Sequence, residues 1–243
     1  MNNQADNFPD KMRTIVIGIG QNGEELIPGL RATPQTINYQ VNPFPQLEAY
    51  PYGPNIKDKL GDQAMVFLVG AINHPDFNRA RELILNHTPF FLWSIGTLSQ
   101  GSKITDSFQI DKREGLILSR DRDALTLIQS IYQGHCGGIM GYDSADTVHV
   151  CGGHELGYAW IEAIHAAYGP ALEKLFMENG AGLLQARAVI LFILFKRPDV
   201  SLTDIETISD ILRSSSGPET VCYMTDGEVP GMVPEFRALF LTS

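Results

Sequence analysis

A glycine-rich turn directly after a short apolar run is the feature that most constrains the fold of this chain. The run Thr14-Ile15-Val16-Ile17 is apolar and β-branched, which is typical of a buried central strand. Glycines then follow in the spacing G-x-G-x-x-G. Without side chains at these positions, the backbone can approach a phosphate closely, and the N–H groups at the start of the next helix can bind it. The pattern predicts the first strand–turn–helix unit of an α/β nucleotide-binding fold. The candidate phosphate-binding residues are Gly18, Gly20, Gln21, Asn22 and Gly23.

The same glycine spacing occurs in dinucleotide-binding enzymes and in turns that bind nothing. In the dinucleotide enzymes an acidic residue about 20 positions further on binds the ribose. Asn42 and Pro43 occupy that place here, which argues against a standard NAD site. A tight strand–helix turn without a ligand remains a further interpretation.

Apolar runs and helical patterns alternate along the first 150 residues. The expected helices cover 24–27, ended early by Pro28 and Gly29, then 77–86 and 123–132. The stretch 44–62 is rich in proline and glycine, so we expect a long loop with at most one helical turn. Alternation at this spacing predicts a Rossmann-like α/β domain with a parallel, doubly wound sheet. The remaining expected strands are 36–41, 64–69, 89–95 and 115–118.

The pattern changes after the glycine-rich stretch 134–153. Apolar residues at helical spacing over 155–168 predict an amphipathic helix, which Gly169 and Pro170 would end. A helix capped at Ser201 is expected among three strands, at 187–195, 220–225 and 235–242. We therefore expect a flexible tail over 1–11, a nucleotide-binding-type α/β domain over 12–150 and a smaller α+β domain over 151–243.

Charge and hydropathy narrow the possible functions. The chain has 18 Lys and Arg against 28 Asp and Glu, a formal charge of −10, which argues against coating nucleic acid. No apolar run approaches the roughly 20 residues of a membrane-spanning helix. The polar first eleven residues lack the apolar stretch of a signal peptide, so we expect a cytoplasmic protein without a transmembrane segment. The cluster His149, Cys151 and His154 lacks a C-x-x-C knuckle, and no metal site is expected.

Both halves of the chain resemble the FtsZ/tubulin family. After the strand 187–195, Arg197-Pro198-Asp199-Val200-Ser201-Leu202 is similar to the Gly-Pro-Asp-Leu-Thr-Leu segment at a helix start in FtsZ. Residues 15–23 are similar to its first phosphate loop, 39–42 to the strand whose Val-Asn end begins its next nucleotide loop, and 64–70 to its Ala-Asp-Met-Val-Phe strand. The resemblance covers most of residues 13–243 at low identity, and implies the two-domain fold of that family.

The resemblance also implies a site shared between subunits. Residues 138–146 are similar to the family's Asn-x-Asp-x-x-Asp loop, which projects over the nucleotide of the next subunit and helps to activate the attacking water. It implies Asp143 and Asp146 as catalytic carboxylates, with Gly141 standing where the family has Asn. The implied cofactor is GTP or GDP with magnesium. Asn42 and Gly70 then join the glycine loop as nucleotide-binding residues.

One departure concerns the family's signature loop, Gly-Gly-Gly-Thr-Gly-Thr-Gly, whose backbone amides wrap the phosphates. This chain has Gly70-Ala71-Ile72-Asn73-His74-Pro75-Asp76 at that place, and Pro75 has no N–H to donate. We therefore expect a guanine-nucleotide-binding protein that self-assembles or docks on a filament-forming partner, and at most a weak GTPase. The alternatives are a Rossmann-type dinucleotide-binding enzyme or sensor, and a nucleotide-free structural adaptor.

Overall fold

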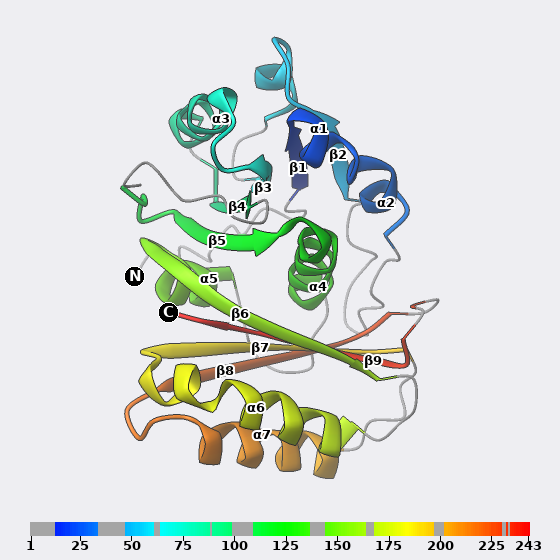
Figure 1. Cartoon of the computed structure of the whole chain (residues 1–243), viewed down its shortest axis with the longest axis vertical. Coiled ribbons are helices and arrows are strands. Elements are labelled where there is room, and N and C mark those ends of the chain that lie inside the picture. Colours follow the sequence, from blue (N-terminus) through cyan, green and yellow to red (C-terminus); the bar gives the residue numbers. More distant parts are fainter. Residues whose placement is uncertain are drawn as a thin grey trace, which may run out of the picture.

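The strands of the chain form a nine-stranded sheet in the order β2-β1-β3-β4-β5-β6-β9-β7-β8 (Figure 1). The computed structural model describes residues 13–33, 47–60, 64–87, 89–98, 109–136, 144–163, 168–196, 202–229, 232 and 234–243. The predicted mixed α/β architecture with a mainly parallel sheet is confirmed. No helix in this described part combines the length and apolar content that crossing a bilayer requires.

The first five strands are parallel, and helices cover both of their faces. Alternate strand residues such as Ile17 and Val16 face opposite sides because the strand period is two. One side packs on α3, and the other packs on α2 and α4. The elements are β1 (Thr14–Ile19), α1 (Gly20–Glu24), α2 (Ile27–Arg31), β2 (Glu48–Pro51), the 3₁₀ turn η1 (Ile56–Lys59), β3 (Met65–Ala71), α3 (Pro75–Asn86), β4 (Phe91–Leu98), β5 (Glu114–Arg120), the 3₁₀ turn η2 (Asp121–Asp123) and α4 (Ala124–Cys136).

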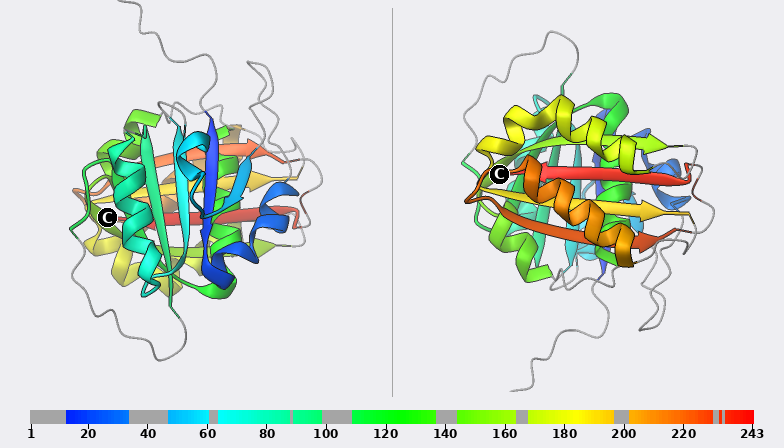
Figure 2. Two further views of the ribbon diagram at one scale, coloured as in Figure 1. Left: turned by 90° about the horizontal axis from the view of Figure 1, so that it is seen from above. Right: turned by 90° about the horizontal axis from the view of Figure 1, so that it is seen from below.

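The remaining elements extend the sheet with antiparallel pairs. β6 pairs in parallel with β5 and antiparallel with β9, which is antiparallel to β7 in turn. Helices α6 and α7 cover the outer face of these strands, whereas α4 lies on their inner face, between the two halves (Figures 1 and 2). The elements are α5 (Ser144–Cys151), β6 (His154–Ala163), α6 (Tyr168–Gln185), β7 (Ala188–Phe195), α7 (Leu202–Ser215), β8 (Val221–Glu228) and β9 (Phe236–Thr242).

The predicted helix over 155–168 is wrong, because residues 154–163 form β6. The side chains of Tyr158 and Trp160 pack towards α4, and those of Ala159 and Ile161 pack towards α6 and α7. Since both faces of this strand are covered, its apolar residues show no two-residue alternation and imitate a helical stripe. Gly169 and Pro170 do not end a helix but lie in the first turn of α6.

Two further predictions in the first half are corrected. Residues 48–51, expected to lie in a loop, form the strand β2 beside β1, and η1 is the single helical turn of that stretch. Pro28 and Gly29 do not end a helix, because Pro28 stands at the start of α2, where its missing N–H costs nothing. The predicted strand 36–41 and the tail 1–11 lie outside the described residues. The domain boundary near residue 150 stays a prediction.

Candidate functional site

The glycine loop lies at the place in the sheet where ligands of α/β proteins gather. β1 has β2 on one side and β3 on the other, so the strand order reverses there, and parallel α/β sheets place their ligands beyond the carboxyl ends of the strands at such a point. A Cβ atom on Gly23 would stand 2.4 Å from the carbonyl oxygen of Val69, and one on Gly70 would stand 2.6 Å from that of Ile19. The glycines therefore allow α1 to lie directly on the ends of β1 and β3. The predicted strand–turn–helix unit is confirmed.

His74 occupies the space above this loop. Gly20 has a φ of +60°, and a Cβ atom there would lie 2.9 Å from Cδ2 and 3.0 Å from Nε2 of His74. The imidazole ring therefore lies against the backbone of Gly20. Its Nδ1 accepts a hydrogen bond from the N–H of Asp76 at 3.2 Å, so the proton of the neutral ring is on Nε2, towards the glycine loop.

The start of α3, where the FtsZ signature loop would stand, uses its hydrogen-bond donors internally. Pro75 has no N–H, and the Asp76 N–H is capped by the His74 side chain. The Phe77 N–H donates to the carbonyl oxygen of His74 at 2.9 Å, and the His74 N–H donates to that of Ala71 at 2.9 Å. None of these backbone groups is left for a phosphate, so this helix start does not form the anion site that helix N-termini otherwise provide.

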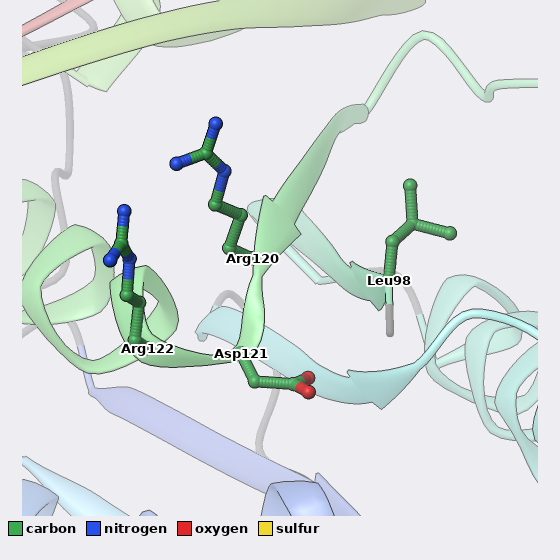
Figure 3. Close-up of a pocket in the computed structure, with 4 residues that line it drawn as sticks. All are labelled: Leu98, Arg120, Asp121 and Arg122. Carbon is green, nitrogen blue, oxygen red and sulfur yellow. The ribbon is translucent and has the colours of Figure 1, made fainter. Parts of the chain in front are cut away.

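A pocket of about 600 Å³ opens at the carboxyl ends of β4 and β5 (Figure 3). Leu98, Arg120, Asp121 and Arg122 line it. The side chains of Arg120 and Arg122 extend to the same side, and that of Asp121 turns away from them. Within the described residues the Arg120 guanidinium has no ion pair, and Arg122 makes only a long contact of 3.7 Å with Asp123. The pocket therefore offers two cations to an anionic ligand.

Three hydrogen bonds fix this pocket relative to the glycine loop and to β6. Asn22 Nδ2 donates to Asp121 Oδ1 at 3.0 Å and so joins α1 to η2. The Tyr158 hydroxyl donates to Asp123 Oδ2 at 3.0 Å and accepts from the Arg120 N–H at 3.4 Å. Burial, together with the hydrogen bond to Asp123, raises the pKa of Tyr158 above its ordinary value. The hydroxyl therefore stays protonated at neutral pH and holds the end of β5 in place.

The structure brings some of the predicted residues together and separates others. Gly18, Gly20, Gly23 and Gly70 lie together at the carboxyl ends of β1 and β3, and Gln21 and Asn22 belong to the adjoining helix α1. Asn42 and Asp143 lie outside the described residues. Asp146 is in the first turn of α5, beside Thr147, whose hydroxyl lies 3.4 Å from His135 Nε2 near the end of α4. Because α4 has 13 residues, Asp146 lies roughly 20 Å from the pocket.

Asp146 therefore lies near the amino ends of the strands, opposite to the glycine loop. Immediately after α5, the Gly153 N–H donates to the carbonyl oxygen of Glu114, at the amino end of β5. The glycine loop and the pocket lie at the carboxyl ends of the strands. Within a single copy of the chain, Asp146 and the glycine loop form no common site.

The residues fit a nucleotide in part. The arginine pocket suits phosphate or sugar groups, whereas His74 lies against Gly20 of the glycine loop and the described N–H groups at the start of α3 are already hydrogen-bonded. Within the described ranges, no group of three or more His, Cys, Asp or Glu side chains is placed to hold a metal ion. His149 and Cys151 both belong to the helix α5.

Comparisons with known proteins agree with this arrangement. No protein-family model matches the sequence, and no curated protein does. An empty FtsZ dimer of M. jannaschii matches with a TM-score of 0.67 and 10% identity, over 96% of this chain and 88% of that one. A GDP-bound CetZ1 monomer from Haloferax volcanii matches with a TM-score of 0.56 and 14% identity, over 96% and 94%. A GTPγS-bound CetZ2 protofilament from the same organism matches with 0.56 and 11%, over 95% and 92%. The chain has a divergent version of the FtsZ/tubulin fold.

Proposed function

We propose that this chain is an FtsZ/tubulin-like subunit that self-associates or docks on a filament-forming partner, and binds a guanine nucleotide with weak or lost hydrolysis. The observation that carries the proposal is the contrast between two neighbouring loops, which touch where His74 lies against Gly20. The glycine loop at 18–23 keeps its close backbone packing, whereas the start of α3 is closed by His74 and Pro75. The first loop supports nucleotide binding, and the second argues against turnover.

The loss of hydrolysis follows from electrostatics. Phosphoryl transfer depends on donors already aimed at the oxygens on which negative charge develops. Bound GTP would supply the reactive γ-phosphate, and this chain would hold its other phosphates with the amides of the glycine loop. Arg120 and Arg122 are the candidate cations for phosphate or sugar groups. The donors at the start of α3 are already bonded to His74 and Ala71.

The placement of Asp146 supports self-association. Asp146 lies near the amino ends of the strands, and the glycine loop lies at their carboxyl ends. If copies of the chain stacked so that the amino ends of the strands in one copy faced the carboxyl ends in the next, Asp146 of the first copy would approach the nucleotide site of the second. The structurally similar CetZ2 forms a GTPγS-bound protofilament.

Replacing Arg120 by alanine is expected to weaken GTP binding by about tenfold to a hundredfold, the usual worth of a hydrogen bond to a charged group. Isothermal titration of the purified chain measures this. Arg213→Ala, on the exposed last turn of α7, is the matched control and should leave the affinity unchanged. If both variants and the unmodified chain bound GTP with equal affinity, the arginine pocket would not be part of the nucleotide site.

A nucleotide-free adaptor is the second candidate, and the closed start of α3 favours it. It differs from the first proposal in that its assembly or docking does not depend on a nucleotide. Sedimentation of the chain with and without GTP and GDP should show assembly that depends on nucleotide in the first case, and assembly or partner docking indifferent to nucleotide in the second. The dinucleotide alternative gains no support from the site geometry.

A further inference from the structure

His74 is the residue at which the two neighbouring loops of the candidate site touch. Its imidazole ring lies against Gly20, where a Cβ atom would stand 2.9 Å from Cδ2 and 3.0 Å from Nε2 of the ring. Nδ1 accepts the Asp76 N–H at 3.2 Å, which holds the ring in place and leaves the proton of the neutral tautomer on Nε2. No residue in the described part of the chain accepts a hydrogen bond from this Nε2–H. A hydrogen-bond donor of fixed tautomer is therefore available beside the glycine loop.

A phosphate placed beyond His74 would find poor surroundings. The backbone N–H groups of His74, Asp76 and Phe77 are already bonded within the chain, and Pro75 has none. Asp76 also brings a carboxylate into the first turn of α3. Such a phosphate therefore meets a negative charge and N–H groups that are already used, which is unfavourable for a further anionic group.

The order of the strands places His74 at one end of an extended ligand. The arginine pocket lies at the carboxyl ends of β4 and β5, whereas the glycine loop follows β1. β3 and β4 separate β1 from β5, so the ends of β1 and β5 are three strand spacings apart, or about 14 Å. A single phosphate ion is too short to contact both places. A nucleotide with its sugar in the arginine pocket directs its phosphates towards Gly20 and His74.

We propose that His74 is the specificity-determining residue of this site, and that it limits the ligand to a nucleoside diphosphate. The inference rests on the proposed function and deepens it, because it names the number of phosphates. The Nε2–H of His74 donates to the second phosphate, and the ring occupies the place that a third phosphate needs. The chain therefore binds GDP more tightly than GTP, which does not fit, and more tightly than GMP, which does not reach the ring.

Two replacements separate the roles of the two ring nitrogen atoms. His74→Asn keeps an acceptor for the Asp76 N–H, because asparagine is a favoured residue at a helix N-cap, but it removes the ring and the N–H beside Gly20. His74→Gln has a longer side chain, whose amide can still donate near the position of Nε2, and it is a poorer cap. We expect His74→Asn to keep the stability of the chain and lose the preference for GDP. His74→Gln should lose stability and keep the preference.

Isothermal titration of the full chain, freed of bound nucleotide, with GMP, GDP and GTP in one magnesium-containing buffer measures this preference. The unmodified chain should bind GDP about tenfold more tightly than GMP or GTP, the usual worth of one hydrogen bond to a charged group. For His74→Asn, the affinities for GDP and GTP should differ by less than about twofold. The ratio of affinities is the decisive quantity, because a general loosening of the site weakens all three ligands alike.

His87→Asn is the matched control. His87 lies at the other end of α3, where its Nδ1 is 2.8 Å from the carbonyl oxygen of Leu83. Its replacement should leave the tenfold preference for GDP unchanged. Thermal unfolding of each variant shows whether the fold is kept.

Four outcomes would overturn the proposal. The unmodified chain binds GTP as tightly as GDP, which would mean that a third phosphate has a place. A folded His74→Asn variant keeps the preference, or His74→Gln loses it. GMP, GDP and GTP bind equally, so that the phosphates do not reach His74; in these three cases the proposed function still stands. If none of the three nucleotides binds, the proposed nucleotide binding fails as well.

Discussion

Replacing Arg81 by methionine is expected to lower the free energy of unfolding by about 3–5 kcal/mol, the usual cost of leaving a buried charge without its partner. The side chain of Glu114, at the start of β5, is completely buried and forms an ion pair with Arg81 of α3. It also accepts a hydrogen bond from the Ser94 hydroxyl of β4. Without the guanidinium, the carboxylate must either stay charged in the core or take up a proton. Urea unfolding at neutral pH measures the loss.

Arg113→Met is the matched control. Arg113 pairs with Asp111 at 3.3 Å, but both side chains are more than a third exposed, at 38% and 39%. Solvent screens such a pair, so this variant should lose less than about 1 kcal/mol. Equal losses of unfolding free energy in both variants would mean that burial does not determine how much the Arg81–Glu114 ion pair stabilises the fold. Because Arg81 also joins α3 to Glu114 of β5, its loss should loosen the helix whose start carries His74.

Replacing Gly23 by alanine is expected to cost about 3 kcal/mol of stability, at the upper end of overpacking penalties, and to abolish nucleotide binding. The added Cβ would stand 2.4 Å from the Val69 carbonyl oxygen and 2.8 Å from the carbonyl carbon of Gly18. Both are backbone atoms, so no change of rotamer relieves the clash. The helix α1 would have to move away from β3, and the glycine loop would lose its close packing on the carboxyl ends of β1 and β3.

Gly53→Ala separates this effect from a general sensitivity to replaced glycines. A Cβ atom on Gly53, between β2 and η1, would meet nothing within 4 Å. This control should change stability by less than about 0.5 kcal/mol. Thermal unfolding of both variants measures the difference. A Gly23→Ala protein as stable as the unmodified chain would contradict the close packing of α1 on β3.

Much of the sheet could be predicted from local sequence. The strands β1, β3, β4, β5 and β7 consist mainly of apolar residues, as expected of strands that are buried on both faces. The same burial explains why the sequence of β6 predicts a helix, because a strand covered on both faces carries no two-residue alternation. Local sequence does not predict α6, although Leu172, Leu175, Phe176 and Leu183 are spaced for a helix, because its glycines and Pro170 argue against one. Packing on the sheet outweighs that propensity.

Only those parts of the site that are formed by residues adjacent in the sequence could be predicted. The glycine loop is a contiguous motif directly after a strand, so its place in the fold followed from the sequence. The contact between Asn22 and Asp121 joins residues 99 positions apart and leaves no local pattern. The packing of His74 on Gly20 is equally nonlocal. Its role as a cap had one usable signal, since Pro75 followed by Asp76 is typical of a helix start.

In the proposed function, the first phosphate loop binds a guanine nucleotide while the closed start of α3 prevents turnover. Calorimetric titration of the stripped protein with GTP and magnesium, followed by phosphate release in the same sample, tests it most directly. We expect a dissociation constant on the order of 10–100 µM, and no phosphate release above background. Tight binding with repeated turnover would contradict it, because the hydrogen bonds of His74 and Pro75–Phe77 would then have to open to receive the γ-phosphate. No binding at all would also contradict it, and would leave the nucleotide-free adaptor as the function of this fold.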